Sequence, residues 1–95
     1  MGEKIKTTKQ IERHVKGIAN HRRIEILMLI QKRKELSLEE IADELNGNLK
    51  TVSEHTRRLA SAGLINKKPA GRLILHTLSP YGQIFYRFLN TFQHS

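Results

Sequence analysis

Apolar and polar residues alternate at helical spacing in five stretches of the chain, and the pattern becomes extended between the fourth and the fifth. The first stretch predicts a helix over residues 7–18, with the capping-box spacing of Thr7 and Gln10 and only a narrow apolar stripe. Asn20 can cap a second helix, which is apolar on nearly every side between residues 24 and 30. We therefore expect the second helix at the centre of the core and the first on the outside or against another subunit.

Residues 37–63 predict a helix-turn-helix. Its first helix begins with a capping box at Ser37, and Asn48 caps its second helix after the break at Asn46-Gly47. Gly63 can end the second helix in a left-handed conformation. The inward stripe of the second helix is expected to consist of Leu49, Val52, Thr56, Leu59 and Ala60.

Residues 64–78 predict a two-stranded hairpin, with strands over residues 64–68 and 72–78. The turn between them is expected at Pro69-Ala70-Gly71, because proline fixes the backbone angle at the second turn position and glycine can close the turn. Basic side chains surround the tip: Lys67, Lys68 and Arg72. A charged hairpin directly after a helix-turn-helix is typical of a wing that follows the sugar-phosphate backbone.

The last helix is predicted over residues 80–92, with Ser79 as its cap and Pro80 at its first position. Its apolar stripe is wide and aromatic, and so small a domain cannot easily bury such a terminal stripe by itself. We therefore expect a homodimer formed by the first and last helices, with part of the stripe packing on the second helix of the same chain. The expected interface residues are Ile11, Val15, Ile18, Tyr81, Ile84, Phe85, Phe88, Leu89 and Phe92.

The length of 95 residues predicts one domain, residues 1–95, with a single modest core. The chain has no cysteine, which excludes disulfides, thiolate metal sites and cysteine nucleophiles. No apolar run approaches the roughly 20 residues of a membrane span, and the N-terminus lacks the apolar run of a signal peptide. We therefore expect a soluble, cytoplasmic protein.

The formal charge of +8 is unevenly distributed. Residues 1–34 hold ten basic and three acidic side chains, residues 35–44 hold five acidic and no basic ones, and residues 45–95 hold seven basic and one acidic. Such segregation is typical of a protein that places one face on nucleic acid and turns another away. The acidic cluster lies on the first turns of a helix, where carboxylates stabilise the helix dipole, so we do not interpret it as a metal or acid–base site.

The outward face of the helix after Asn48 has the chemistry of a DNA-reading helix. Short hydrogen-bonding groups lie near its N-terminal end and guanidinium groups further on, which suits base-edge contacts flanked by phosphate contacts. Taken alone, this helix fits an ordinary amphipathic helix with a solvated face equally well, and its neighbours favour DNA. The predicted DNA-binding residues are Lys50, Thr51, Ser53, Glu54, His55, Arg57 and Arg58 on this helix and Lys67, Lys68 and Arg72 on the hairpin.

Cations in the first turn of two helices oppose the helix dipole, at a cost of about 0.3–1 kcal/mol each unless an anion is near. A phosphate would be such an anion for Lys50. Arg22 and Arg23 are in the same position on the second helix, where a phosphate contact and pairing with Glu25 or another carboxylate both remain open.

Four strings carry a family resemblance: Ala19-Asn-His-Arg-Arg-Ile-Glu-Ile-Leu, Leu38-Glu-Glu-Ile-Ala-Asp-Glu-Leu, Thr51-Val-Ser-Glu-His55 and Leu59-Ala-Ser-Ala-Gly-Leu-Ile65. With the order of elements, they resemble the ArsR family of winged helix-turn-helix transcriptional regulators from about His14 to Phe92. The last two strings are the more specific. The resemblance implies a homodimer of the first and last helices and a major-groove face made of Thr51, Ser53, Glu54 and His55.

The chain departs from that family where metals are sensed. Many members use cysteines of the third helix, and others use aspartate and histidine pairs on the last helix, where this chain has only His94. Thr56 stands where the family usually has leucine. No i, i+4 pairing or other short ligand spacing occurs among the histidines, which are His14, His21, His55, His76 and His94. We therefore predict no metal and no cofactor.

Together these patterns predict a mainly α winged helix-turn-helix protein that binds double-stranded DNA as a homodimeric, sequence-specific repressor, without a membrane partner. One alternative is a winged-helix module that binds protein in the transcription apparatus, and a second is a non-specific architectural DNA-binding protein. An enzyme is not expected. The nearest approach to a catalytic triad is Ser53-Glu54-His55, and adjacent residues on a helix point in different directions.

Overall fold

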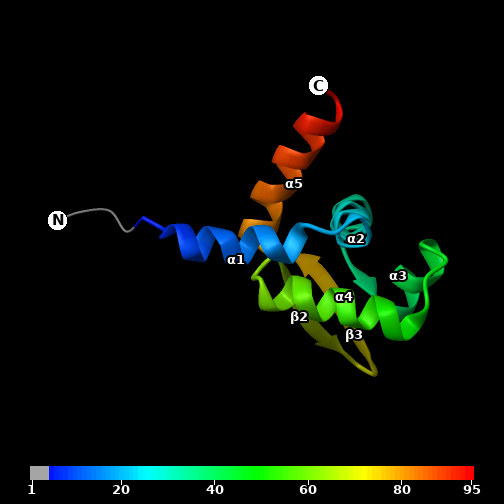
Figure 1. Cartoon of the computed structure of the whole chain (residues 1–95). Helices are drawn as coiled ribbons and strands as arrows, with labels where there is room; N and C mark the ends of the chain where they lie inside the picture. Colours follow the sequence, from blue (N-terminus) through cyan, green and yellow to red (C-terminus); the bar gives the residue numbers. More distant parts are fainter. Residues whose placement is uncertain (1–4) are drawn as a thin grey trace.

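A computed structural model describes residues 5–95; the first four residues of the predicted domain lie outside this range. Within residues 5–95 it contains five helices and a three-stranded antiparallel sheet (Figure 1). The elements are α1 (Thr8–Ile18), α2 (His21–Arg33), β1 (Leu36–Ser37), α3 (Leu38–Glu44), α4 (Leu49–Ser61), β2 (Ile65–Ala70), β3 (Leu73–Leu78) and α5 (Pro80–Gln93). The predicted winged helix-turn-helix order is confirmed.

Every helix begins at the cap that the sequence predicts. A side-chain oxygen accepts a hydrogen bond from a first-turn amide at Thr7, Asn20, Ser37, Asn48 and Ser79. Complete capping boxes form in α1 and α3, where the side chain of the third helical residue also accepts from the cap amide. Because a cap of this kind contributes about 1 kcal/mol, these five residues fix the helix starts locally.

Helix α2 is the centre of the core, as predicted. Its Ile26, Leu27 and Ile30 are completely buried, and the helix contacts α1, α4, α5 and β3. The buried apolar side chains around it are Ile18, Leu36, Ile41, Ala42, Val52, Leu59, Ala62, Leu64 and Ile65. These residues come from both helices and strands, so one core supports the helix-turn-helix and the base of the hairpin together.

Two of the predicted positions are wrong. Ile18 was expected at the dimer interface, but it is only 5% exposed and packs in the core of its own chain, so it offers no surface to a partner. Leu49 was expected in the inward stripe of α4, but it is 49% exposed. It is the first residue of α4, directly after the turn, and the buried stripe begins one turn later with Val52.

The sheet has one strand more than predicted. Residues Leu36 and Ser37 form the short strand β1, which pairs with His76 and Leu75 of β3, and the strand order is β1-β3-β2. Two residues are too short to show an alternating pattern. Ser37 is also the N-cap of α3, so the strand leads into the helix without a loop.

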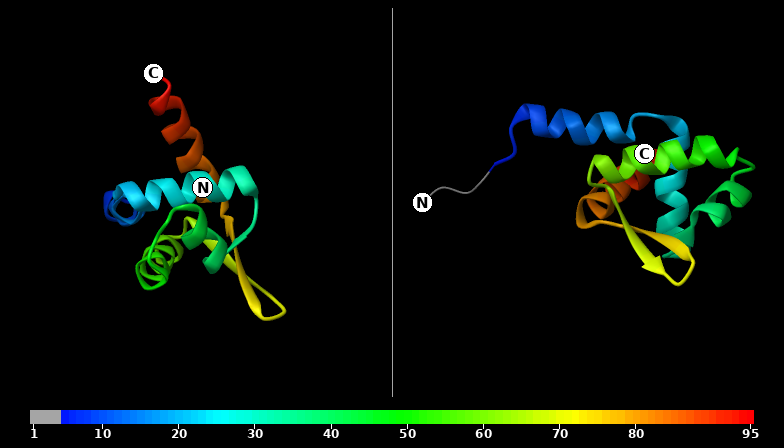
Figure 2. Two further views of the ribbon diagram at one scale, coloured as in Figure 1. Left: turned by 90° about the vertical axis from the view of Figure 1, so that its right-hand side faces the viewer. Right: turned by 90° about the horizontal axis from the view of Figure 1, so that it is seen from below.

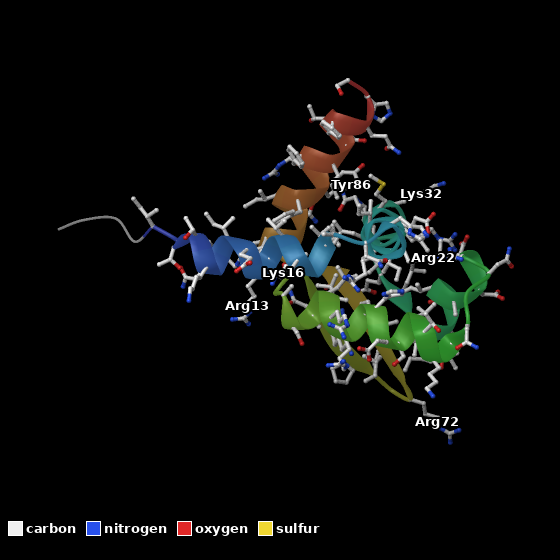
Figure 3. All side chains as sticks on the ribbon, viewed as in Figure 1. Arg13, Lys16, Arg22, Lys32, Arg72 and Tyr86 are labelled. Atoms are coloured by element: carbon white, nitrogen blue, oxygen red, sulfur yellow. The ribbon has the colours of Figure 1, made fainter. Side chains whose placement is uncertain are left out.

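The hairpin turn begins two residues later than predicted and is one residue shorter. Strand β2 continues through Ala70, and Pro69 pairs with Ile74, which leaves Gly71 and Arg72 as the turn. Gly71 takes the left-handed conformation at φ 65°. Proline fits in β2 because this is an edge strand of the sheet. Consequently Arg72 stands at the tip itself (Figure 3), whereas Lys67 and Lys68 lie along β2.

Two parts of the molecule project from the helical body in opposite directions. The β2–β3 hairpin extends on one side, next to α4, and α5 rises on the other side (Figures 1 and 2). The chain therefore separates the surface formed by α4 and the hairpin from the far end of α5.

A buried histidine joins β3 to β1. His76 is 2% exposed, and its Nδ1 lies 3.0 Å from the carbonyl oxygen of Leu36. Burial lowers the pKa of His76 from its ordinary value of 6.5, the Leu36 carbonyl acts in the opposite direction, and the charge of Lys67 lowers the pKa further. The imidazole is therefore neutral in the folded protein at neutral pH.

We expect the fold to lose stability as the pH falls below about 6.5. In the unfolded chain His76 takes up a proton near that pH, whereas the folded chain takes it up only at the lowered pKa, so between the two values the unfolded state binds more protons. The contribution of His76 is complete above this window, and its slope inside the window reaches about 1.4 kcal/mol per pH unit. Urea unfolding at pH values between 7.5 and 5 measures this change in the free energy of unfolding.

The matched variant for this prediction is His76→Gln, which keeps a side-chain donor for the Leu36 carbonyl and does not titrate. Its unfolding free energy should depend less on pH than that of the wild type across the same window. If both proteins had the same pH profile, the protonation of His76 would make no contribution to the pH dependence of the unfolding free energy.

Candidate nucleic-acid interface

The residues predicted to bind DNA lie on one side of the molecule, on α4 and the adjacent hairpin. Those exposed on α4 are Lys50, Thr51, Ser53, Arg57 and Arg58, while Glu54 and His55 are half-buried, and those exposed on the hairpin are Lys67, Lys68 and Arg72. A groove of about 330 Å³ separates the two elements and brings Ser53 of α4 opposite Lys67 and Arg72. The helix and the wing thus border a common depression.

Glu54 holds the two arginines of the helix in place. Its carboxylate accepts hydrogen bonds from Nε and Nη2 of Arg57, at 3.2 and 2.5 Å, and from Nε of Arg58, at 3.1 Å. The hydrogen bond from Arg57 lowers the pKa of Glu54, and the same contact raises the pKa of Arg57. Because exposed ion pairs contribute little to stability, a phosphate can compete for either guanidinium.

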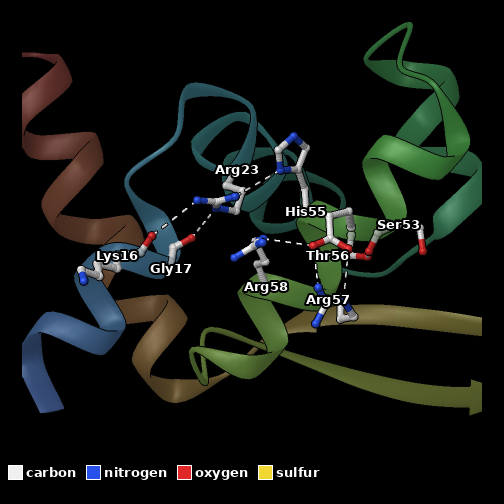
Figure 4. Close-up of polar contacts among 9 residues, drawn as sticks. Lys16, Gly17, Arg23, Ser53, His55, Thr56, Arg57 and Arg58 are labelled. Carbon is white, nitrogen blue, oxygen red and sulfur yellow. Dashed lines mark hydrogen bonds and ion pairs between the residues drawn. The ribbon is translucent and has the colours of Figure 1, made fainter.

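Arg23 of α2 fixes the position and the tautomer of His55. Its Nη1 lies 3.3 Å from Nδ1 of His55 (Figure 4). Since a guanidinium can only donate, Nδ1 accepts and the ring proton lies on Nε2. Burial lowers the pKa of His55, as do the charges of Arg23 and Arg22, so the neutral ring has an N–H donor at Nε2. Donors of this kind recognise the major-groove acceptors of guanine, adenine and thymine.

The two alternatives for the first turn of α2 are resolved differently for its two arginines. Arg22 pairs with the carboxylate of Glu25 at 3.1 Å, which is the second of the two alternatives. It also donates to the carbonyl oxygen of Leu45 at 3.2 Å. Arg23 forms no ion pair within residues 5–95. Sequence analysis could not indicate its contact with His55, because the two residues are 32 positions apart and lie on different helices.

The remaining cations of the predicted site differ in whether they form an ion pair within the protein. Lys68 on the wing forms an ion pair with Glu35 at 2.8 Å. In the described part of the chain, Lys50, Lys67 and Arg72 form no ion pair. Their charges are available to a polyanion without breaking a contact in the protein.

The faces of α1 and α5 expose apolar side chains next to each other. Ile11 and Val15 of α1 and Tyr81, Ile84, Phe88 and Phe92 of α5 are each more than two-fifths exposed. The Phe88 and Phe92 rings stack at 5.9 Å between centroids. An apolar hollow of about 190 Å³ lies between the two helices, lined by Lys6, Ile11, His14, Tyr81, Ile84 and Phe85. Phe85 and Leu89 pack partly against the core of their own chain, as expected.

His14 connects the apolar face to the end of α4. Its Nδ1 lies 2.6 Å from the carbonyl oxygen of Ala62, and its ring is 5.1 Å from that of Tyr81. Helix α1 therefore contacts the C-terminal end of the helix that carries the basic face, and α5 is linked to it through the ring of His14. The sequence did not indicate this role for His14.

Among residues 5–95 no group of three or more histidine, aspartate or glutamate side chains is arranged to hold a metal ion. The same residues contain no helix with the length and apolar character needed to cross a membrane.

This architecture, with an exposed basic α4 and a basic hairpin, defines a winged helix-turn-helix protein. The chain is similar to the solution structure of the homodimeric winged helix-turn-helix DNA-binding domain of Mb0332 from Mycobacterium bovis, which is described as a possible ArsR-family transcriptional regulator. The TM-score is 0.83 and the sequence identity is 24%, over 99% of this chain and 91% of that chain. HlyU from Vibrio cholerae has a TM-score of 0.84 and 25% identity over 97% and 100% of the two chains. The transcriptional repressor PagR of Bacillus anthracis has a TM-score of 0.78 and 20% identity over 86% and 94%.

The predicted resemblance to ArsR-type winged helix-turn-helix proteins is thus confirmed in the fold. The family described as HVO_A0114 matches residues 18–84, and the chain belongs to this family. No curated protein matches the chain in sequence.

Proposed function

We propose that this protein is a cytoplasmic, homodimeric repressor that binds a pseudo-palindromic operator in double-stranded DNA. Each protomer would place α4 in a major groove, and the two recognition helices would lie about 34–36 Å apart. The observation that carries this proposal is the exposed basic face of α4 bordered by the basic wing. Two of the structures named above support it, since the M. bovis domain is described as a possible ArsR-family transcriptional regulator and PagR as a transcriptional repressor.

The dimer is supported by the apolar face of α1 and α5, which a single chain leaves exposed. Contiguous apolar surfaces of this kind on small domains mark protein–protein contacts. The M. bovis domain with the same fold is described as homodimeric. The proposed interface consists of Ile11, Val15, Tyr81, Ile84, Phe85, Phe88, Leu89 and Phe92, without Ile18.

The experiment that tests the function is selection from a pool of random duplexes across a salt series, with the mass of the complex measured alongside. A two-fold symmetric site bound by a dimer, with affinity falling steeply as salt rises, would support the proposal. Equal binding of all duplexes would favour an architectural protein, and absence of binding at moderate salt would favour a protein-binding module.

We expect Arg57→Ala and His55→Ala to weaken binding in different ways. Loss of the phosphate contact at Arg57 should reduce affinity for operator and random duplexes alike and lower the salt slope by about 1 per protomer. Loss of the donor at His55 should mainly reduce discrimination between the operator and its single-base variants, by about 1–3 kcal/mol per site. Anisotropy titrations on both kinds of duplex measure this.

Lys32→Ala serves as the control for both variants, because it removes one exposed charge of α2 that is not among the residues proposed to bind DNA. If Arg57→Ala and His55→Ala lowered specific and non-specific affinity in equal proportion, the division of roles between the two residues would be wrong.

A further inference from the structure

A basic hollow lies between α1 and α4, on the side of the recognition helix that faces away from the wing. We call it the α1–α4 basic pocket. It has a volume of about 230 Å³ and is lined by eight residues, among them Arg13 and Lys16 of α1, Arg23 of α2, and Arg57 and Arg58 of α4. Figure 4 shows Lys16, Arg23, Arg57 and Arg58 on these three helices. Five of these eight side chains are cationic and none is acidic. Arg13 and Lys16 of α1 are not among the residues predicted to bind DNA, and for Arg23 of α2 the sequence left a phosphate contact open as one of two alternatives.

The charges in this pocket are only partly balanced. Two carboxylates pair with its cations: Glu12 with Lys16 at 3.5 Å, in an exposed pair, and Glu54 with the two arginines of α4. Arg13 and Arg23 form no ion pair in the described part of the chain. Burial lowers the pKa of Arg23, the nearby charge of Arg58 lowers it further, and the charge of Glu54 acts in the opposite direction. An anion would relieve this repulsion.

Backbone carbonyls hold the two unpaired arginines in position. Nη2 of Arg13 donates to Ser61 at 3.0 Å, and Nε of Arg23 donates to Gly17 at 2.6 Å, with a longer contact from its Nη2 to Lys16. These carbonyls belong to the last turns of α4 and α1. A guanidinium has five N–H donors, so each arginine is fixed by some of them and keeps others for a ligand.

The pocket is rigidly attached to the recognition helix. A Cβ atom on Gly17 would lie 2.2 Å from Cβ of Ala62, so α1 rests directly on the end of α4 at this point. A ligand bound by Arg13 and Lys16 of α1 would therefore also be placed relative to Arg57 and Arg58. Four of the residues that line this hollow carry planar guanidinium groups. Such groups suit the oxygen atoms of a phosphate, which they bind in pairs of hydrogen bonds.

The position of the pocket on α1 indicates which phosphate it meets. One side of α1 carries Ile11 and Val15 of the proposed dimer face, and another side carries Arg13 and Lys16 of the pocket. The pocket thus lies between the dimer face and the recognition helix, while the wing lies beyond α4. In a two-fold dimer on DNA, the side nearest the dimer face is turned toward the centre of the operator.

We propose that the α1–α4 basic pocket of each protomer binds a DNA backbone phosphate between the two half-sites of the operator. This inference rests on the proposed function and adds to it a phosphate contact from α1 and α2. The wing would hold phosphates at the outer ends of the site, and the pocket would hold those near its centre.

The test combines a protein variant with chemically neutralised DNA. Arg13→Gln/Lys16→Gln removes two pocket cations, and Lys9→Gln/Lys32→Gln removes the same charge outside the pocket. Each dimer is titrated with an operator duplex and with one that carries methylphosphonates at the central phosphates. We expect the neutral linkages to weaken wild-type and control binding about 10-fold and to leave binding by the pocket variant nearly unchanged. The salt slope of the pocket variant should fall by about 2 for the two pockets of the dimer.

Arg13→Gln also removes the hydrogen bond to Ser61, so Lys16→Gln alone is the second variant, and thermal unfolding checks that each variant folds. An equal loss for the pocket and control variants on methylphosphonate DNA would overturn the proposal. The salt slope is also measured on a random-sequence duplex. This measurement tests whether the pocket binds a backbone phosphate even if no operator is enriched and the proposed function fails. If the wild type bound no duplex, both proposals would be overturned.

A free phosphate compound is the other source of the same chemistry. Inorganic phosphate is therefore compared with chloride at matched ionic strength in thermal unfolding. Stabilisation of the wild type by phosphate that disappears in the pocket variant, together with equal DNA binding by both, would assign the pocket to a small anion and overturn the DNA assignment.

Discussion

Replacing Ile84 with lysine is expected to convert the dimer to monomers and to lower operator affinity by about 100-fold or more. Ile84 is 52% exposed in the single chain and lines the hollow between α1 and α5, so in the proposed dimer an uncompensated ammonium would be buried there. Two linked DNA-binding modules gain about 10²–10⁴ in affinity over one module, and the monomer loses this gain.

The measurements are sedimentation velocity for the mass and anisotropy for DNA binding. Because Ile84 is exposed in the protomer, the variant should keep the circular dichroism of the wild type. It should also bind a single half-site as strongly as a wild-type protomer does. Leu73→Lys, a similar change at a 47% exposed position on the wing, should remain dimeric. A dimeric Ile84→Lys protein would place the interface elsewhere.

Loss of half-site binding would mean something different. Helices α1 and α5 touch the end of α4 through His14, which contacts both Ala62 and Tyr81. If Ile84→Lys weakened half-site binding as well, the disturbance would have passed along this contact to the recognition helix. The two readouts therefore separate loss of avidity from loss of recognition.

The parts of the fold that were predicted correctly depend on local signals. Caps such as Thr7, Ser37 and Ser79 act within one helical turn, and a periodic stripe is visible in any window longer than about ten residues. Strand β1 was missed because two residues show no period. The turn was misplaced because Pro69 is acceptable in an edge strand, a property that depends on the neighbouring strand and not on the local sequence.

For the candidate site, the sequence indicated which residues face outward on α4 but not what they contact. The pairing of Glu54 with both arginines follows helical spacing and was within reach of sequence analysis. In contrast, the contact between Arg23 and His55 and the ion pair between Lys68 and Glu35 join residues more than 30 positions apart. The α1–α4 basic pocket likewise exists only once three helices are packed together.

The second large effect is expected on stability: Gly82→Ala should lower the free energy of unfolding by about 3 kcal/mol. Alanine normally stabilises a helix by about 1 kcal/mol relative to glycine, so intrinsic propensity predicts the opposite sign. The structure reverses it, because a Cβ on Gly82 would lie 2.0 Å from the carbonyl oxygen of Leu64 and 3.1 Å from its carbonyl carbon. These are backbone atoms, which cannot turn aside as a flexible side chain would.

The start of α5 has little freedom to move away from this contact. The amide of Ser79 donates to the Leu64 carbonyl at 3.1 Å, its hydroxyl donates to the Gly63 carbonyl at 2.6 Å, and the amide of Gly82 donates to the same hydroxyl at 3.0 Å. A methyl group at position 82 must break these bonds or tilt the helix. Tilting would also displace the apolar face on α5, so we expect weaker dimerisation together with a thermal midpoint lowered by more than about 10 °C.

Asn90→Ala is the matched control, since it makes a favourable propensity change at an exposed position of the same helix. It should leave the thermal midpoint unchanged or raise it slightly, as measured by circular dichroism at several protein concentrations. A Gly82→Ala protein as stable as the wild type would mean that α5 can shift on Leu64 without cost. Helix α5 would then not be fixed to the body, and its apolar face could not hold two recognition helices at a constant spacing.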